Sequence, residues 1–471
     1  MPPDTVGSGG MRTLVTDGTV VTASDTVAAD VLIVDEQVAA VGIDVGGGAG
    51  VDRVVDATGR YVLPGGVDVH THMELQTPYG VASDDFATGT AAAAWGGTTT
   101  IVDYAGHDYG EPLLAGLAGW RQKAAKSHLD HGLHMMVREV NARVLAELPA
   151  LVAAGVSSIK LFMACPGVYM VDDAAIFRVL GAAQECGVLV AMHAENGGPI
   201  DVLIERHVAA GETAPIFHAR SRPAAMEAEA TGRAIALAEL AGAPIYIAHL
   251  SSAAALATVR AARDRGVAVY AETCPQYLYL SDADLARPGF EGAKYVCSPP
   301  LRAATDQHEL WTGLRQGDLQ VVATDHSPFH LGQKELGRGD FTRIPNGLPG
   351  VEDRLTLLFQ GVVDRQISLN RFVALTATIP AKIFGLYPRK GTIAPGSDAD
   401  LVILDPQAER TISAATHHMN VDYSCYEGRR VQGGIETVLQ RGNVIVADGS
   451  YFGRPGAGRY LARGLPDYSS C

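Results

Sequence analysis

The sharpest local signal of chemistry is the His-x-His sequence of His70 and His72, at the end of the apolar run VDVHTH. In a strand, residues two positions apart point to the same side, so both imidazoles can meet one metal ion. Two turn histidines bonded to backbone groups are the alternative interpretation. His193 and His249 also follow apolar runs, which favours a metal site. Imidazole suits zinc and other divalent metals.

Asp325 and Lys160 follow similar apolar runs, in ATDHSPF and SIKLFMA. A carboxylate beside metal-binding histidines can ligate the metal and can accept a proton from an activated water. A helix N-cap or a salt bridge is the alternative for Asp325. Burying an unpaired ammonium is costly, so an ion pair with a nearby acid is the simpler interpretation of Lys160. A carbamylated lysine would instead be an anionic bridging ligand.

The runs that carry these side chains alternate with alanine-rich helical stretches such as 145–155 and 224–242. Eight strands alternating with helices predict a (β/α)8 TIM-type barrel, with its active site at the C-terminal ends of the strands. A doubly wound open sheet is the rival, but no G-x-G-x-x-G sequence follows the first strand. The expected strands are 61–70, 98–105, 132–137, 158–164, 188–195, 244–251, 267–273 and 320–327.

The two ends of the chain differ from the middle in their pattern of expected secondary structure. Short β-rich runs with turn residues fill 11–60 and return in 390–471, whereas the strand and helix alternation spans 61–389. The simplest architecture joins both ends in one small β domain beside the barrel. Residues 1–10, MPPDTVGSGG, are expected to form a flexible tail.

Composition excludes several classes of protein. The 471 residues carry a net charge of -15 and no Lys/Arg-rich block, which argues against nucleic acid or an anionic membrane as a partner. Six cysteines form no C-x-x-C pair and are expected to be reduced thiols. No signal peptide and no apolar stretch of about 18 residues is visible. We therefore expect a cytoplasmic protein with a small-molecule substrate.

Ten short sequences in fixed order resemble the dihydropyrimidinase and D-hydantoinase group of cyclic amidohydrolases, from about Arg12 to Leu465. The resemblance implies a (β/α)8 barrel and a small β-sandwich built from both chain ends. It also implies two zinc ions per subunit, with other divalent metals possible, and a homotetramer. The sequences are HTH, SIKLFMA, MHAEN, AHLSSA, ETCPQYL, SPPLR, TDHSPF, IPNGLPGVEDR, GSDADLVILDP and HHMNVDYSCYEG.

The same resemblance implies a role for each matching residue. His70, His72 and Asp325 match the ligands of the more buried metal, and Asp325 also matches the catalytic base. His193 and His249 match the ligands of the second metal. The bridging carboxylated lysine corresponds to Lys160, and the substrate-binding positions correspond to Ser298 and Asn346. The implied reaction is attack of a metal-bridging hydroxide on a ring carbonyl, which opens a hydantoin or dihydropyrimidine to an N-carbamoyl amino acid.

Cys165 departs from the family pattern, because typical members carry a tyrosine there that supports the oxyanion. A thiol is smaller and a weak donor. Losing one oxyanion donor costs ~3–4 kcal/mol. The metal could hold the oxyanion alone and leave room for a bulkier ring, or Tyr169 or a loop residue could replace the donor. Otherwise the enzyme is weak or a deliberate variant.

Other functions share parts of this pattern. A cyclic imide hydrolase or an allantoinase- or dihydroorotase-like enzyme would use the same metal ligands. A carboxylated substrate would need an arginine in the pocket. Arg302, in the SPPLR sequence, is the candidate. A non-catalytic assembly relative would have lost ligands, whereas all six are present here. The loop 73–86 is atypical in its middle, so the preferred ring substituent cannot be copied from relatives.

Overall fold

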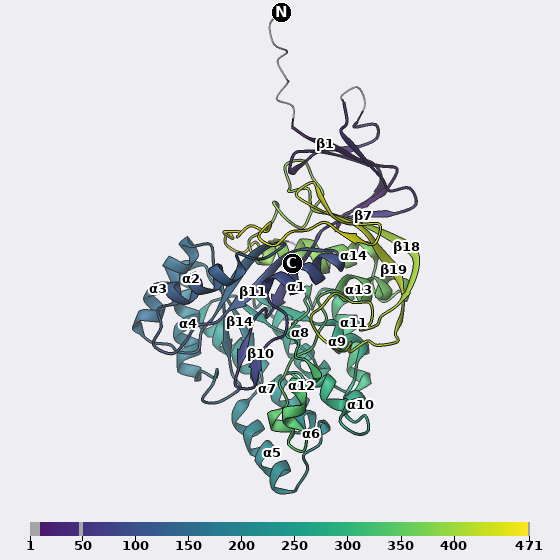
Figure 1. The fold of residues 1–471 in the computed structure, drawn as a ribbon. Helices are drawn as coiled ribbons and strands as arrows, with labels where there is room; N and C mark the ends of the chain where they lie inside the picture. Colours follow the sequence, from purple (N-terminus) through teal and green to yellow (C-terminus); the bar gives the residue numbers. More distant parts are fainter. Residues whose placement is uncertain (1–9, 47–49, 470–471) are drawn as a thin grey trace, which may run out of the picture.

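The computed structural model describes residues 10–46 and 50–469, and its largest unit is an eight-stranded parallel barrel (Figure 1). The order of the strands around the barrel follows their order in the chain. Their residues are buried throughout, as expected of parallel strands covered by helices. The strands are β8 (Gly66–Thr71), β11 (Thr98–Ala105), β12 (Asp130–Met136), β13 (Ser158–Phe162), β14 (Leu189–His193), β15 (Ile245–Ile247), β16 (Val269–Thr273) and β17 (Val321–Val322).

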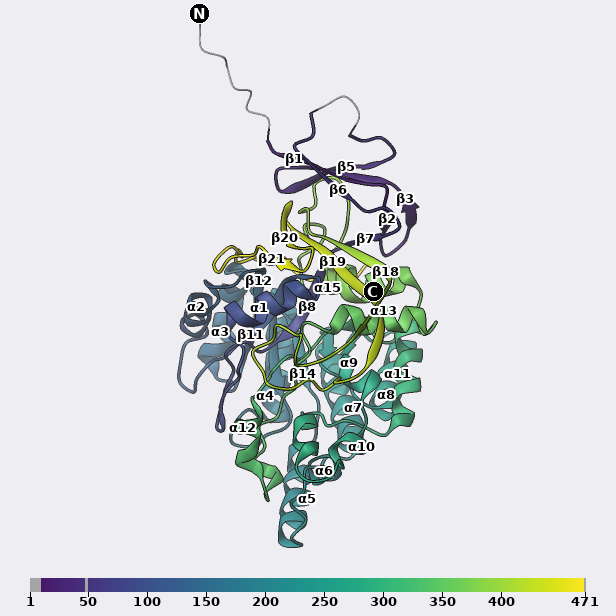
Figure 2. The same ribbon diagram turned by 45° about the vertical axis from the view of Figure 1, so that its right-hand side comes forward.

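Helices connect successive barrel strands and surround the barrel (Figures 1 and 2). Their ends carry local stop and start signals: Asp172 caps the first turn of α4 by accepting from the Ala175 N–H at 2.7 Å, and Gly187 ends that helix with φ 78°. The helices are α1 (Phe86–Trp95), α2 (Leu113–Ala124), α3 (Ala142–Ala153), α4 (Asp173–Cys186), α5 (Gly197–Ala209), α6 (Ile216–Arg220), α7 (Ala224–Ala241), α8 (Ala253–Asp264), α9 (Pro275–Tyr279), α10 (Asp282–Leu285), α11 (Ala304–Gln316), α12 (Leu331–Lys334), α13 (Arg354–Val363), α14 (Leu369–Val373) and α15 (Ile379–Ile383).

A buried arginine joins the first and last strands of the barrel. The Nη1 atom of Arg354 donates to the Val67 carbonyl of β8 at 3.0 Å and to the Val322 carbonyl of β17 at 3.1 Å. Nearer the C-terminal ends, Thr71 and His326 form an isolated parallel bridge. These contacts satisfy polar groups that an open sheet edge would leave unpaired.

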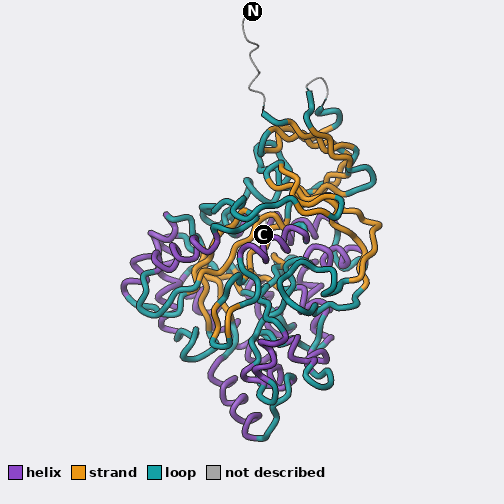
Figure 3. Tube along the Cα trace, viewed as in Figure 1, coloured by secondary structure: helices purple, strands orange, loops and turns teal. Residues whose placement is uncertain are grey.

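Strands from both ends of the chain form a β-sandwich beside the barrel (Figure 3). Apolar residues of the two sheets, such as Val31 and Ile33 from one and Val62 and Leu401 from the other, form one buried core. One sheet contains β5 (Gln37–Gly42), β4 (Asp30–Val34), β1 (Arg12–Thr16) and β6 (Arg53–Asp56). The other contains β21 (Ser450–Tyr451), β20 (Asn443–Ala447), β19 (Arg430–Gln440), β18 (Leu401–Thr411), β7 (Tyr61–Pro64), β2 (Thr19–Val21) and β3 (Thr26–Ala28).

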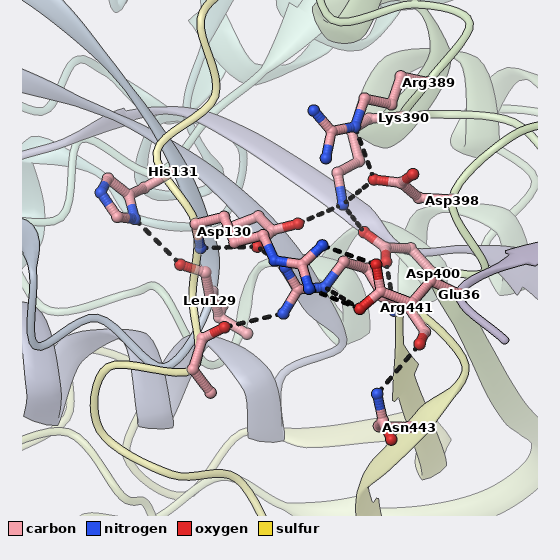
Figure 4. Close-up of polar contacts among 12 residues, drawn as sticks. Glu36, Leu129, Asp130, His131, Arg389, Lys390, Asp398, Asp400, Arg441 and Asn443 are labelled. Carbon is pink, nitrogen blue, oxygen red and sulfur yellow. Dashed lines mark hydrogen bonds and ion pairs between the residues drawn. The ribbon is translucent and has the colours of Figure 1, made fainter.

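A buried group of charged residues, here called the ion cluster, links barrel and sandwich (Figure 4). Asp130 is the first residue of β12, at the N-terminal end of the barrel strands. Its carboxylate accepts from Lys390 Nζ at 2.7 Å and from Arg441 Nη1 at 2.9 Å. Lys390 also pairs with Asp398 at 3.0 Å and Asp400 at 2.8 Å.

The main departure from expectation lies at the start of the barrel. The run 61–70 was expected to form one strand, but β7 ends at Pro64 and pairs with β18 in the sandwich, and β8 begins at Gly66. At Gly65 a Cβ atom would lie 2.1 Å from Thr99 Oγ1, so the chain passes too close for a larger residue. The domain boundaries at 60/61 and 389/390 stay predictions.

The tail predicted for 1–10 lies outside the described residues, except for Gly10. Of the described helices, none has both the length and the apolar character needed to cross a bilayer.

Candidate metal centre

Four of the expected metal ligands lie in or directly after barrel strands. His70 is the fifth residue of β8, and His72 follows the last residue of that strand. His193 is the last residue of β14. Lys160 was expected to end its strand but is the third of five residues in β13, so its long side chain has to cover the remaining rise toward the strand ends.

The other two ligands depend on unusual backbone geometry. His249 lies two residues after β15 with φ 37°, and Asp325 lies three residues after β17 with φ 52°. Positive φ values are uncommon outside glycine and concentrate at functional sites, where the surrounding structure holds them. The apolar runs predicted that these residues follow strands, but not this conformation.

One aspartate oxygen brings the first three ligands together. Asp325 Oδ1 lies 3.1 Å from His70 Nε2 and 3.1 Å from His72 Nε2. The three ligand atoms all lie within 4.8 Å of one another. Lys160 Nζ is 2.9 Å from His70 Nε2. Burial lowers the pKa of His72 to about 4, so this imidazole is neutral at neutral pH.

The remaining two histidines face each other beside this group. His193 Nδ1 lies 3.0 Å from His249 Nε2, and both rings are buried. The His249 ring centroid is 5.3 Å from that of His70, so the two groups adjoin. These six residues, here called the ligand cluster, therefore meet at the C-terminal ends of the strands.

Two buried carboxylates determine which imidazole nitrogens keep a lone pair. Glu272 contacts His70 Nδ1, and Glu195 lies 2.9 Å from His193 Nε2. An ionised carboxylate only accepts, so each of these nitrogens carries the hydrogen. In a neutral imidazole the opposite nitrogen then holds a lone pair. In the neutral form, His70 Nε2 and His193 Nδ1 are thus the nitrogens whose lone pairs face the ligand cluster.

Lys160 has no acidic partner of the kind that the residues alone favoured. Its side chain is buried, and among the described residues no carboxylate oxygen lies within 4.0 Å of Nζ. Nζ also lies over the Tyr104 ring, 4.4 Å from its centroid. Burial lowers the pKa of Lys160. The ion-pair interpretation of this lysine is therefore wrong for the described part of the chain.

The donor set fits a divalent metal. Imidazole nitrogens and a carboxylate oxygen converge at about 3 Å. Within the described residues, His72 Nδ1 and His249 Nδ1 are buried without a hydrogen-bond partner. Such sets of nitrogen and oxygen atoms are typical zinc ligands.

A cavity of about 300 Å³ opens onto the ligand cluster. Ser298, Asn346 and Cys165, the three residues expected to meet substrate, all line it. Asn346 Nδ2 donates to Ser298 Oγ at 3.2 Å. Cys165 is exposed and has φ 62°. Leu75 and residues 77–79 of the atypical first loop also line this cavity.

A larger neighbouring cavity of about 1160 Å³ shares Tyr169 and part of the first loop with it. The Tyr169 ring stacks on Phe162 at 4.9 Å, and Arg138 lies over its other face at 4.6 Å. Arg138 lines only the larger cavity. Tyr169 therefore contributes an aromatic wall between the two spaces.

The sequence analysis overlooked Glu195, although the MHAEN sequence places this acid two residues after His193. Glu272, the other carboxylate beside the cluster, contacts His70 Nδ1. His326, which follows Asp325, instead pairs through Nε2 with Asp84 Oδ2 at 3.0 Å.

Comparison with known proteins agrees with this geometry. The model of the amidohydrolase family matches residues 61–431. The D-hydantoinase of Streptomyces coelicolor is 55% identical over 464 residues, which cover 97% of this chain and 99% of the relative. The D-hydantoinase of Geobacillus stearothermophilus is 50% identical over 461 residues, covering 96% and 97%.

This chain also resembles a solved structure of the same group in its three-dimensional fold. The crystal structure of dihydropyrimidinase from Brevibacillus agri aligns with a TM-score of 0.95 and 52% identity, covering 97% of this chain and 99% of that one. The expected fold class, a barrel with a sandwich built from both chain ends, is confirmed. This chain therefore belongs to the amidohydrolase family, among the cyclic amide hydrolases related to D-hydantoinase and dihydropyrimidinase.

Proposed function

We propose that this protein opens the ring of hydantoins and dihydropyrimidines to give N-carbamoyl amino acids. The observation that carries the proposal is the cavity of about 300 Å³, which is lined both by five of the six cluster residues and by Ser298 and Asn346. A flat ring with alternating N–H and C=O groups can meet these polar side chains while one carbonyl lies over the ligand cluster. Similarity to proteins named D-hydantoinase over almost the whole chain supports this substrate class and the D enantiomer.

The ligand cluster would hold two zinc ions. His70, His72 and Asp325 would bind one, and His193 and His249 the other. Lys160, carboxylated on Nζ, would bridge them, and the absence of an acidic partner within 4.0 Å supports this assignment. When bound, the metals lower the pKa of a water and polarise the carbonyl that it attacks.

The side chains of this protein perform the remaining steps. Asp325, whose side chain is 13% exposed, would accept a proton from the attacking water and transfer it to the leaving ring nitrogen. Ser298 and Asn346 would hold the ring so that one carbonyl faces the ligand cluster. Glu195 and Glu272 would keep the tautomers of His193 and His70 fixed throughout turnover.

Substrates with a carboxylate on the ring fit this cavity poorly. Arg302, the arginine expected to recognise such a group, instead donates to Glu227 Oε2 at 3.0 Å and to Ser251 Oγ at 2.9 Å. Of the described residues that line the cavity, none is an arginine. A dihydroorotase-like activity therefore lacks its anion receptor. A non-catalytic role is disfavoured because all six ligands are present and converge.

Cys165 would adapt the cavity to larger ring substituents. A thiol occupies less space than the tyrosine found in typical relatives and lies on the cavity wall. Tyr169 also lines this cavity, and its hydroxyl accepts a hydrogen bond from Arg138 Nη2 at 3.5 Å. We expect turnover without the phenol that typical relatives carry at position 165.

The decisive experiment measures ring opening by the purified, zinc-loaded protein. The substrates are dihydrouracil, hydantoin, a 5-aryl hydantoin and a simple cyclic imide, and Cys165→Tyr is assayed beside the wild type. We expect the wild type to prefer the 5-aryl hydantoin and the variant to shift toward the small rings. Turnover of the imide alone would replace the proposal with imide hydrolysis, and no turnover with bound zinc would refute it. A homotetramer and a cytoplasmic location complete the proposal.

A further inference from the structure

Ser298 receives hydrogen bonds from two directions. The residue is half-buried and lines the smaller cavity. Asn346 Nδ2 lies 3.2 Å from its Oγ atom, and His218 Nε2 lies 3.3 Å from the same atom. A hydroxyl has one hydrogen and two lone pairs, so the identity of its donors decides where its own hydrogen can point.

The tautomer of His218 follows from its other neighbour. His218 lies in α6 and is only 2% exposed. Its Nδ1 atom is 3.1 Å from Arg222 Nη1. A guanidinium only donates, so Nδ1 accepts and Nε2 carries the hydrogen. Burial, together with the Arg222 charge, lowers the pKa of His218 well below its usual range, so the ring is neutral.

The Nε2 hydrogen of His218 points at the segment that carries the substrate-binding serine. It lies toward the Cys297 carbonyl, 2.8 Å from Nε2, and toward Ser298 Oγ. With His218 and Asn346 both donating, the lone pairs of Oγ are engaged and its hydrogen is left for the cavity. We propose that His218 is a positioning residue that holds the Ser298 hydroxyl as a donor toward a ring carbonyl of the substrate, an inference that rests on the proposed function.

A second residue, Lys334, holds the backbone on both sides of the cavity. Lys334 is buried, and its Nζ atom joins the segments that carry Ser298 and Asn346. It donates to the carbonyls of Val296 at 3.2 Å, Pro345 at 2.8 Å and Gly347 at 2.9 Å. Loss of the His218 ring would remove its contacts with the Ser298 hydroxyl and the Cys297 carbonyl, whereas the three contacts of Lys334 would keep both segments in place.

Steady-state kinetics on the preferred ring test the proposal. A bond made equally in the ground and transition states affects KM alone. Loss of one hydrogen bond to the substrate corresponds to about a tenfold change. We expect His218→Leu to raise KM about tenfold with kcat within about twofold, and His218→Gln, which restores an N–H donor, to recover KM to within about threefold. A fall in kcat with unchanged KM would overturn the proposal.

A coupled variant separates positioning from general damage to the fold. If His218 acts through the hydroxyl, His218→Leu should change nothing further once Ser298→Ala is present. A full additional loss in that background would contradict the proposal. His207→Leu is the matched control, because His207 lies in α5, the helix that precedes α6, pairs with Glu212 and does not line the smaller cavity.

Hydrogen positions provide a readout that does not depend on turnover. Neutron diffraction from crystals of the zinc-loaded protein should place hydrogen on Nε2 of His218 and direct the Ser298 hydroxyl into the cavity. Hydrogen on Nδ1, or a hydroxyl directed at Asn346, would refute the inference whatever the activity. If the wild type opens no ring while these hydrogens lie as expected, the proposed function fails and only the arrangement of His218 and the Ser298 hydroxyl stands.

Discussion

The two ends of the barrel each bury a lysine among charged or ionisable groups, but only one end is electrostatically complete. At the N-terminal end, the three hydrogens of the Lys390 ammonium meet Asp130, Asp398 and Asp400 at 2.7–3.0 Å (Figure 4). At the C-terminal end, Lys160 meets a histidine nitrogen and no described carboxylate within 4.0 Å.

This difference separates a structural cluster from a reactive one. In the ion cluster both oxygens of Asp130 accept hydrogen bonds, from Lys390 and from Arg441 and the Arg459 N–H. In the ligand cluster, imidazole nitrogens and a carboxylate oxygen instead converge in an arrangement that fits a divalent cation. A buried polar group that its own protein leaves unsatisfied is therefore the better guide to chemistry.

The largest effect should come from making the same substitution at both ends. Asp325→Asn removes the proposed proton acceptor and should lower kcat/KM by about 10³–10⁴-fold. Asp130→Asn should leave kcat/KM of the folded enzyme within about twofold, since it lies at the opposite ends of the strands. Hydantoin opening by each purified variant is the measurement. Equal losses in both variants would erase the contrast between the clusters.

When stability is measured instead of activity, the order of the two clusters should reverse. Two lysine-to-methionine variants test this. Lys390→Met removes the cation that three buried carboxylates share and leaves them only the partners that Arg441 gives Asp130 and Arg389 gives Asp398, which should cost about 3–5 kcal/mol of unfolding free energy. Lys160→Met should change that free energy by less than about 1 kcal/mol while abolishing zinc binding, because an apolar chain replaces an unpaired amine. Urea unfolding of the metal-free proteins and zinc content by mass spectrometry measure both.

Lys334 offers an intermediate case with only carbonyl partners. Burial lowers its pKa from 10.5 to about 8. The unfolded chain then binds more protons than the folded one between these values, so stability should rise as pH increases through that window. The rise is expected to reach up to about 3 kcal/mol and to vanish in Lys334→Met. Urea midpoints at several pH values would show it, and an identical rise in the variant would disprove this origin.

The smallest effect is expected at the exposed edge of the ion cluster. Arg459 pairs with Glu36 at 2.6 Å through both terminal nitrogens, but both side chains are largely open to solvent. Arg459→Met should therefore cost only about 0–1 kcal/mol, and added salt should reduce the difference further. A loss as large as that of Lys390→Met would mean that burial does not govern this cluster.

Local spacing was enough to predict much of the barrel and of its site. All eight parallel strands were expected from buried β-branched runs, and His70 and His72 were paired through their separation of two residues. These features depend on short-range periodicity, which a single sequence displays directly. The roles of Lys160, Ser298 and Asn346 came from family resemblance, because their residue types alone also fit ordinary ion pairs and loops.

The chain sequence thus carried the fold class and the pairing of His70 with His72, since both depend on neighbouring residues. It could not show that Asp130 meets residues 260 and 311 positions away, nor that His249 and Asp325 turn through positive φ values to reach the centre. It also could not reveal His218 behind Ser298, 80 positions apart. Such contacts exist only after folding closes long loops, and no local pattern records which distant partner satisfies a buried polar atom.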